Sequence, residues 1–303
     1  MKKIVGIGAN VCDTLITLSE YPIEDTKIKA ETIIKSGGGP CATALVTSAK
    51  LGVNCVYIGN LANDNEGKFL YNDLVKYSVS TECVDIIEGC SSFCSYVLLN
   101  EKNGTRTCVF HRGNVQPTVM DERRMETVKN ADILLVDGND LQAAIDAAKI
   151  AKENGVLVLY DAGGLYDGVE ELLKLTDILI PSQEFVFKIT NTDNVNEAAK
   201  ILYEKYAPQV VVITCGKDGG IIFDGRELKK YPSFRVLVKD SNGAGDVFHG
   251  AFAYALTNDM SYYDACVFSS AVSAIKCTKI GAREGTPSLS EVELFLKERG
   301  INV

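Results

Sequence analysis

The chain has 303 residues, of which 46% are hydrophobic and 23% are charged, a balance typical of folded globular proteins and not of disordered ones. Its 40 aspartates and glutamates outnumber its 31 lysines and arginines, which gives a formal net charge of −9. Phosphate backbones and anionic membranes repel such an acidic chain, so we expect neither nucleic acid nor a membrane as a partner.

Short apolar runs alternate with longer amphipathic segments along most of the chain. This alternation predicts an α/β fold in which a doubly wound, mostly parallel sheet carries helices on both faces, within one domain over residues 1–303. Ligands bind such sheets in the loops that follow the carboxyl ends of the strands. Strands are expected at 3–9, 55–60, 132–137, 156–161, 177–181, 210–214 and 220–223, and helices near 40–51, 66–77, 141–153, 194–206, 246–257, 262–279 and 289–299.

Two segments depart from this alternation. Residues 11–37 contain no good helical pattern, and residues 93–112 read as two strands joined at 101–104, where Asn103-Gly104 is a hairpin-turn signal. We expect strands from both segments to form a small β-sheet that lies over the binding face as a lid. Arg106 and Arg112, on its last strand, would then face the substrate or its phosphates, or else lie on an ordinary solvated edge.

The ten cysteines are scattered, with no C-x-x-C pair. The first residues run directly into a strand pattern, without the charged and apolar regions of a signal peptide, and no apolar run reaches the ~18–20 residues of a membrane span. We therefore interpret the cysteines as reduced, mostly buried thiols of a cytoplasmic protein.

The segment 240–257, DSNGAGDVFHGAFAYALT, is the most informative one. Gly243, Ala244 and Gly245 follow an expected strand at 235–240 and open a helix whose first turn carries Asp246. Small residues at a helix N-terminus let backbone amides approach an anion, and a carboxylate beside them can accept a proton from a hydroxyl that attacks a phosphate. The alternative is that Asp246 only caps the helix and the glycines only form a tight turn.

Three other stretches place small or acidic residues after expected strands. TCGKDG at 214–219 follows the apolar run VVVIT, SGGGP at 36–40 leads into a helix, and Asp13 follows the first strand. Each stretch alone is compatible with a plain turn. Together, at successive strand ends, they indicate a ligand site.

These motifs resemble those of the ribokinase-like (PfkB) carbohydrate kinases. DSNGAGD is similar to the family signature Asp-Thr-x-Gly-Ala-Gly-Asp, and GGPCATALVTSAKLG is similar to the signature in which two glycines lead into a helix ending in Leu-Gly. TCGKDG resembles the nucleotide segment Thr-x-Gly-x-x-Gly, and GAREGTP resembles the terminal Gly-Ala loop. Their order fits over essentially the whole chain, and implies a ribokinase-like fold with a small β lid.

The resemblance implies an ATP- and Mg²⁺-dependent kinase in which Asp246 is the catalytic base. Asp246 would deprotonate the sugar hydroxyl that attacks the γ-phosphate of ATP, and the amides around Gly243, Ala244 and Gly245 would hold the phosphate and its developing charge. The remaining implied residues fall into two groups: Thr214, Gly216, Gly219, Gly281 and Ala282 for the nucleotide, and Asp13, Gly38, Gly39 and Thr43 for the sugar.

The sequence also departs from the family pattern. Thr43 stands where the family has a substrate-binding Asn, Ser241 replaces the signature Thr, and the magnesium-associated Asn-x-x-Glu appears as Ser182-Gln183-Glu184-Phe185. Glu184 would then organise the waters of the metal from a shifted position. These changes argue against ribose by default, and the stretches around 243–256 and 277–287 resemble branches that act on ketoses and related hexose derivatives, including fructokinases and kinases of sugar acids.

Several alternatives remain open at this point. Arg106, Arg112 and Lys102 would suit a sugar that is already phosphorylated, and a nucleoside is a further candidate substrate. A non-catalytic sugar or nucleotide sensor of the same fold is disfavoured because Asp246 is present. A dinucleotide-binding oxidoreductase, suggested by Gly6-Ile7-Gly8, lacks the third glycine, since position 11 is Val11.

Two further expectations concern association and ions. Exposed edges of the lid sheet favour pairing, so we expect a homodimer through the lid. The resemblance, and nothing derived from the residues themselves, implies a monovalent cation such as K⁺ near Asp240 and the 281–287 loop.

Overall fold

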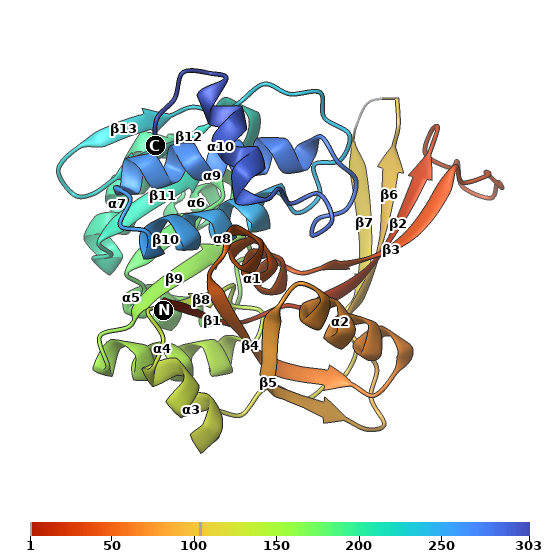
Figure 1. Ribbon diagram of the computed structural model, residues 1–303, viewed down its shortest axis with the longest axis horizontal. Coiled ribbons are helices and arrows are strands. Elements are labelled where there is room, and N and C mark those ends of the chain that lie inside the picture. Colours follow the sequence, from red (N-terminus) through yellow and green to blue (C-terminus); the bar gives the residue numbers. More distant parts are fainter. Residues whose placement is uncertain (1, 103–104) are drawn as a thin grey trace.

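A nine-stranded sheet forms the centre of the molecule (Figure 1). The computed structural model describes residues 2–102 and 105–303, so the expected Asn103-Gly104 turn lies outside the described residues. The strands from β11 to β5 are parallel, whereas β12 and β13 are antiparallel. In sheet order they are β13 (Leu228–Tyr231), β12 (Gly220–Phe223), β11 (Val210–Thr214), β10 (Ile178–Pro181), β9 (Leu157–Ala162), β8 (Ile133–Val136), β1 (Lys3–Ile7), β4 (Asn54–Ala62) and β5 (Val79–Ile87).

Helices cover both faces of this sheet, which confirms the predicted fold class. Because successive strand side chains point to opposite faces, Leu135 and Leu159 pack in one apolar core while Leu134 and Val158 pack in the other. The first core is covered by α1 (Pro40–Leu51), α2 (Asn65–Lys76), α8 (Ala244–Thr257), α9 (Tyr262–Cys277) and α10 (Leu289–Lys297). The second is covered by α3 (Glu122–Lys129), α4 (Leu141–Glu153), α5 (Val169–Leu175), α6 (Gln183–Thr190) and α7 (Val195–Tyr206).

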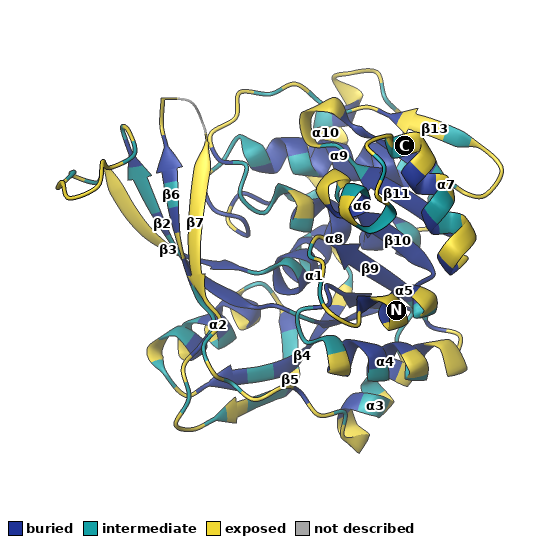
Figure 2. Cartoon of the chain, turned by 180° about the vertical axis from the view of Figure 1, so that it is seen from behind, coloured by how far each residue is buried: buried dark blue, intermediate teal, exposed yellow. Residues whose placement is uncertain are grey.

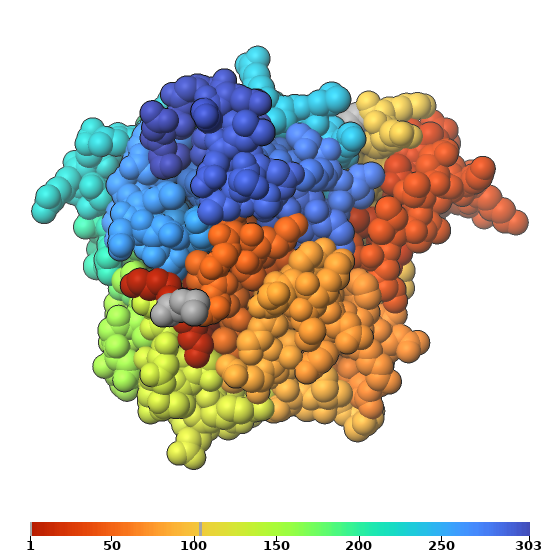
Figure 3. Space-filling model, viewed as in Figure 1, coloured from red at the N-terminus to blue at the C-terminus, as the bar shows by residue number. Residues whose placement is uncertain are grey.

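A separate four-stranded sheet projects from one side of the molecule (Figures 1 and 2). We call it the small sheet; its order is β3 (Thr32–Gly38), β2 (Val11–Leu18), β6 (Cys94–Asn100) and β7 (Arg106–His111). Its strands come from the two segments in which the sequence predicted them. One of its faces is apolar and open to solvent, since Ile33, Tyr96 and Val109 are 67%, 51% and 61% exposed. Figure 3 shows the small sheet at the edge of the molecule in a space-filling view.

The prediction of a strand at 235–240 is wrong, because this stretch forms no regular element. Its apolar residues do not reach a core: Leu237 is 82% exposed. The backbone amides of Lys239 and Asp240 instead donate to the carbonyl oxygen of Cys277 at the end of α9. The segment is therefore a loop that the end of α9 holds in place in front of α8.

No helix in the part of the chain that the structure describes is both long and apolar enough to cross a bilayer.

Candidate active site

The carboxyl ends of neighbouring parallel strands bring the predicted residues to one edge of the main sheet. Asp161 lies at the end of β9, Pro181 ends β10 and Thr214 ends β11, while the chain leaves β1 toward Asp13. Helices α1 and α8 start at the same edge and pack closely, because Ser48 donates a hydrogen bond of 2.8 Å to the carbonyl of Gly250. Two loops that are distant in the sequence, 240–243 and 281–286, complete this edge.

The loop before α8 has a conformation that requires glycine. Gly243 is the N-cap of α8 with a φ of 74°, a left-handed conformation that favours glycine. A Cβ atom at this position would lie 2.5 Å from the Cβ atom of Ala282, so the 281–286 loop packs directly on it. Gly245, in the first turn of α8, is exposed, and a Cβ atom added there would meet no neighbouring atom within 4 Å. The helix N-terminus thus opens toward solvent at Gly245, with N–H groups that lack intrahelical partners, although the N–H of Ala244 donates to the carbonyl oxygen of Ser241 over 3.3 Å.

Asp246 lies in the first turn of α8, beside this opening. Burial, and secondly the carboxylate of Asp161, raise its pKa to about 7. A carboxyl group with a pKa near neutrality can both accept and release a proton at physiological pH. The position therefore suits a general base next to an anion-binding helix terminus.

Asp161 and His249 lie beneath Asp246, and both are buried. The Nδ1 atom of His249 is 2.7 Å from the carbonyl oxygen of Gly245 and 3.2 Å from a carboxylate oxygen of Asp161, while its Nε2 atom is 3.0 Å from the carbonyl oxygen of Ile180. Burial lowers the pKa of His249 and raises that of Asp161. His249 therefore anchors the first turn of α8 to β9 and β10. Sequence reasoning missed Asp161, although it ends the apolar run VLVLYD.

Asp13 and Gly38 come together on the other side of the opening. Asp13 is buried and accepts a hydrogen bond of 2.6 Å from Ser95, and its other carboxylate oxygen is 3.5 Å from the side-chain amide nitrogen of Asn242. A Cβ atom at Gly38 would lie 2.1 Å from that second oxygen. These contacts join β2, β6 and the loop before α8, so Asp13 lies beside the start of α8. We call the region between Asp13 and the start of α8 the cleft.

Two predicted sugar-site residues, Gly39 and Thr43, occupy different environments. Gly39 is the N-cap of α1 with a φ of 90°, and a Cβ atom there would lie 2.5 Å from the carbonyl oxygen of Ala9. Thr43 is completely buried in α1, and its hydroxyl has no hydrogen-bond partner among the described residues. Gly39 thus shapes the cleft through its backbone, whereas Thr43 lies below its surface.

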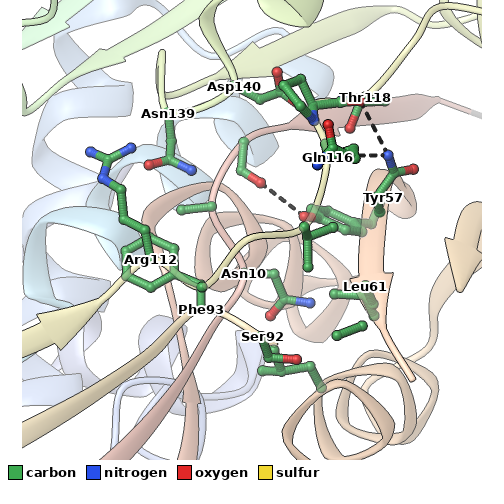
Figure 4. Close-up of a pocket in the computed structure, with 18 of the residues that line it drawn as sticks. Asn10, Tyr57, Leu61, Ser92, Phe93, Arg112, Gln116, Thr118, Asn139 and Asp140 are labelled. Carbon is green, nitrogen blue, oxygen red and sulfur yellow. Dashed lines mark hydrogen bonds between the residues drawn. The ribbon is translucent and has the colours of Figure 1, made fainter. Parts of the chain in front are cut away.

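A cavity of about 310 Å³ lies between the main sheet and the small sheet (Figure 4), and neither Asp13 nor Asp246 is among its lining residues. Its lining includes Asn10, Phe93 and Arg112. The guanidinium carbon of Arg112 lies 5.9 Å from the ring centre of Phe93 and 5.7 Å from that of Tyr166, two cation–π contacts. The buried side-chain nitrogen of Asn10 has no hydrogen-bond partner in the described part of the chain. Both groups are hydrogen-bond donors for a bound molecule.

Arg106 connects the small sheet to the loop before α8. Its Nη1 atom donates a hydrogen bond of 3.1 Å to the hydroxyl of Ser241. The predicted alternatives for this arginine were a substrate-facing position and a solvated edge. The structure places it at the rim of the cleft, in contact with the loop before α8.

The residues expected around the nucleotide lie in two segments, 214–219 after β11 and the loop that begins at Gly281. Thr214 forms a parallel bridge with Ser182, and its hydroxyl is 3.5 Å from the carbonyl oxygen of Pro181. Gly216 and Gly219, with φ values of 57° and 80°, bound a single 3₁₀ turn. Gly281 donates its backbone N–H to a carboxylate oxygen of Asp240 over 2.9 Å. The 281–286 loop therefore contacts the loop before α8, whereas the 214–219 segment contacts the end of β10.

The two implied metals find different surroundings. No group of three or more His, Cys, Asp or Glu side chains suited to a metal occurs within residues 2–102 and 105–303. Glu184 follows β10 at the start of α6, where its exposed carboxylate forms a salt bridge of 2.7 Å with Lys188 that lowers its pKa. The surroundings of Asp240 do not fit a monovalent cation, because the ammonium group of Lys276 already lies there.

An arginine that the sequence reasoning did not single out holds three of these segments together. Arg283 is completely buried and donates to Asp73 over 2.6 Å, to Asn10 over 2.7 Å and to the carbonyl oxygen of Gly38 over 2.6 Å. It thereby connects the 281–286 loop to α2, to the end of β1 and to the end of β3. Its position in GAREGTP gave no signal of these distant partners.

Comparisons with known proteins find relatives that span the whole chain. A ribokinase of Lactococcus lactis is 28% identical to this chain and covers 100% of both proteins. An ATP-dependent ribose-1-phosphate kinase of Halopiger xanaduensis (99% of both chains) and a probable fructokinase of Arabidopsis thaliana (97% of this chain and 96% of that one) are each 26% identical.

Solved structures share the whole fold. A putative ribokinase of Agrobacterium tumefaciens, 24% identical, superposes with a TM-score of 0.92 over 98% of both chains. The Arabidopsis thaliana ribokinase in complex with ribose and ATP, 25% identical, superposes with a TM-score of 0.86 over 98% of this chain and 99% of that one. The pfkB family carbohydrate kinase pattern matches residues 1–289. The chain therefore belongs to the pfkB family of carbohydrate kinases.

Proposed function

We propose that this carbohydrate kinase transfers the γ-phosphate of ATP to a hydroxyl group of a small sugar, a hexose or ketose or a related sugar acid. The observation that carries the proposal is Asp246, a carboxyl group with its pKa raised to about 7 beside an open helix N-terminus. Asp13 lies across the same cleft and offers acceptor oxygens for sugar hydroxyls.

In the proposed reaction, Asp246 takes the proton of the attacking hydroxyl, and the new oxygen–phosphorus bond forms as the bond to ADP breaks. The amides at Gly243, Ala244 and Gly245 stabilise the charge that develops on the transferred phosphate. Asp13, Gly38 and Gly39 position the sugar. Arg106, which contacts Ser241, brings the small sheet over the cleft and helps to exclude water.

The nucleotide is proposed to lie along Thr214, Gly216 and Gly219, with the Gly281–Ala282 turn beside it. When bound, Mg²⁺ neutralises part of the charge of the triphosphate. Glu184 would hold waters of that ion from the start of α6. These assignments predict that Glu184→Gln weakens the dependence of the rate on Mg²⁺ more than it changes the KM for the sugar.

A second acceptor class, a sugar that already carries an anionic group, is favoured by Arg112. This arginine lines the cavity and has cation–π contacts, and no ion pair with a carboxylate is found for it among the described residues. Asn10, whose side-chain nitrogen is buried without a hydrogen-bond partner in the described part of the chain, also lines this cavity. A phosphate or carboxylate on the sugar would satisfy both groups, whereas a nucleoside would rely on the ring of Phe93.

The acceptor is identified by an ADP-release assay over neutral ketoses, hexoses, pentoses, sugar acids, sugar phosphates and nucleosides. We expect the highest kcat/KM with a hexose or ketose derivative. Arg112→Gln separates the two acceptor classes: it raises the KM of an anionic sugar on the order of tenfold or more, and leaves that of a neutral sugar nearly unchanged. Saturable sugar binding without ADP release in any mixture would instead indicate a sensor.

We also propose a homodimer formed through the small sheet. The exposed apolar residues Ile33, Tyr96 and Val109 share one of its faces, and a second copy would remove them from water. Sedimentation tests this directly: Val109→Asp should convert a dimer into a monomer, and a wild-type monomer at micromolar concentration would refute the proposal.

We place the reaction in the cytoplasm. All ten cysteines are free thiols, and reduced thiols persist in that compartment.

A further inference from the structure

Lys276 is an unusual lysine because its side chain is completely buried. It lies in the last turn of α9, and burial lowers the pKa of its ammonium group. Lysines are almost never fully buried without a partner, since the charged group loses its hydration. Because Lys276 lies next to the loop before α8, we expect its buried ammonium group to act through its contacts with that loop.

The partner of Lys276 is Asp240, in the loop that leads to α8. The Nζ atom lies 2.8 Å from the backbone carbonyl oxygen of Asp240 and 3.4 Å from its carboxylate oxygen Oδ2. The same carboxylate accepts the backbone N–H of Asn242 over 2.8 Å and that of Gly281 over 2.9 Å. Asp240 thus ties the two loops together, and Lys276 balances its charge.

The two loops that Asp240 joins shape the opening at the start of α8. Ala282 packs on Gly243, the N-cap residue next to the proposed phosphate site. Gly285 packs between this loop and Lys276, because a Cβ atom there would lie 2.7 Å from the carbonyl oxygen of Gly281 and 3.3 Å from the Cε atom of the lysine. The ammonium group therefore sits behind the phosphate-facing loop, without touching the opening itself.

A second ammonium group engages the same loop from its other side. Lys50, in the last turn of α1, donates to the carbonyl oxygens of Arg283 and Thr286. Oxygen atoms of this kind, a carboxylate and backbone carbonyls, are the usual ligands of a hard cation. In this chain the oxygens named here are bound by two lysines.

We propose that the ammonium group of Lys276 serves as a built-in monovalent cation that holds the 240–243 and 281–286 loops in their phosphate-binding arrangement. The inference rests on the proposed kinase function. On this proposal, Lys276 is a positioning residue that acts through Asp240 and Gly281. The proposal predicts that the enzyme works without added K⁺, whereas the family resemblance implies dependence on a monovalent cation.

The first test uses the wild-type protein. Its kcat and its melting temperature are measured in buffers whose only other cations are Mg²⁺ and tetramethylammonium, with and without KCl at constant ionic strength. We expect K⁺ to change neither quantity. Severalfold activation by K⁺, or a rise in melting temperature specific to K⁺ over tetramethylammonium, would overturn the proposal.

The second test compares two variants that lose the same charge. Lys276→Ala leaves a space beside Asp240, so we expect its kcat to fall on the order of tenfold to a hundredfold and to recover when K⁺ or NH₄⁺ is added. Lys276→Met fills the same space with a neutral side chain, so its rate should not recover. Full activity of Lys276→Ala without K⁺, or equal responses of both variants, would show that Lys276 only packs in the core.

The melting temperatures of the two variants separate this inference from the kinase assignment. K⁺ should raise the melting temperature of Lys276→Ala and leave that of Lys276→Met unchanged, and neither measurement requires a sugar or turnover. If the proposed function failed, this selective stabilisation would still be expected. If only the inference failed, turnover would remain and the selective stabilisation would be absent.

Discussion

Two glycines at the start of α8, Gly243 and Gly245, should change the stability of the protein in opposite directions when each is replaced by alanine. Gly243→Ala places a side chain at a φ of 74°, which costs roughly 1–2 kcal/mol, and brings its Cβ atom to 2.5 Å from that of Ala282, which adds roughly 1–3 kcal/mol of overpacking. We therefore expect the free energy of unfolding to fall by about 2–5 kcal/mol. Gly245→Ala meets no atom within 4 Å and gains helix propensity, so it should stabilise the protein by about 0.5 kcal/mol.

Activity should fall in both variants, although for different reasons. In Gly243→Ala the loop moves away from its phosphate-binding geometry, whereas in Gly245→Ala the new methyl group blocks the close approach of the phosphate to the backbone. Urea unfolding curves and the KM for ATP are measured for each variant. Equal losses of stability in the two variants would refute the loop geometry, and an unchanged KM and kcat in Gly245→Ala would refute the phosphate site.

Three more predictions concern charged groups. Because the pKa of Asp246 is raised from 3.8 to about 7, its ionised form is disfavoured in the folded protein, and the free energy of unfolding falls as the pH rises from 3.8 through 7. Asp246→Asn should therefore raise the free energy of unfolding by at most about 4 kcal/mol at pH 8 and leave it unchanged below pH 3.8. Urea titration measures both values. In wild type, kcat/KM should rise with pH and level off above about 7. Arg283→Met leaves Asp73 buried without its partner, so the free energy of unfolding, measured by thermal unfolding, should fall by roughly 3–5 kcal/mol. Arg123→Met is the control: the salt bridge of Arg123 with Asp85 is exposed, so its loss should lower the free energy of unfolding by less than about 1 kcal/mol.

The sequence was sufficient for the main sheet because its strands are continuous apolar runs with separate helical patterns between them. The edge strands β5 and β13 and the short helices α3, α5 and α6 were not predicted. In β5 only Val79 and Cys83 are buried, and β13 carries two exposed lysines, so neither strand has the continuous buried apolar run of a central strand. The stretch 235–240 shows the opposite failure, since its apolar residues remain exposed.

The candidate site divides in the same way. Asp246 and the glycines before it could be predicted because their chemistry lies in one short motif. Asp161, Lys276 and Arg283 could not be assigned, because their roles depend on partners distant in the sequence: Arg283 meets Asp73, and Lys276 meets Asp240 only after α8 and α9 have packed. A local pattern indicates that a residue is polar, but not which distant group will neutralise it once it is buried.

The central claim is that Asp246 is the base of a phosphoryl transfer to a sugar. The most direct measurement follows labelled γ-phosphate from ATP into the sugar, for wild type, Asp246→Asn and Asp264→Asn. Asp264 provides a matched control, because it occupies the first turn of the neighbouring helix α9 away from the cleft. We predict that Asp246→Asn lowers the transfer rate by about 10²–10⁴-fold and that Asp264→Asn stays within about twofold of wild type. Transfer by Asp246→Asn at the wild-type rate would contradict the account.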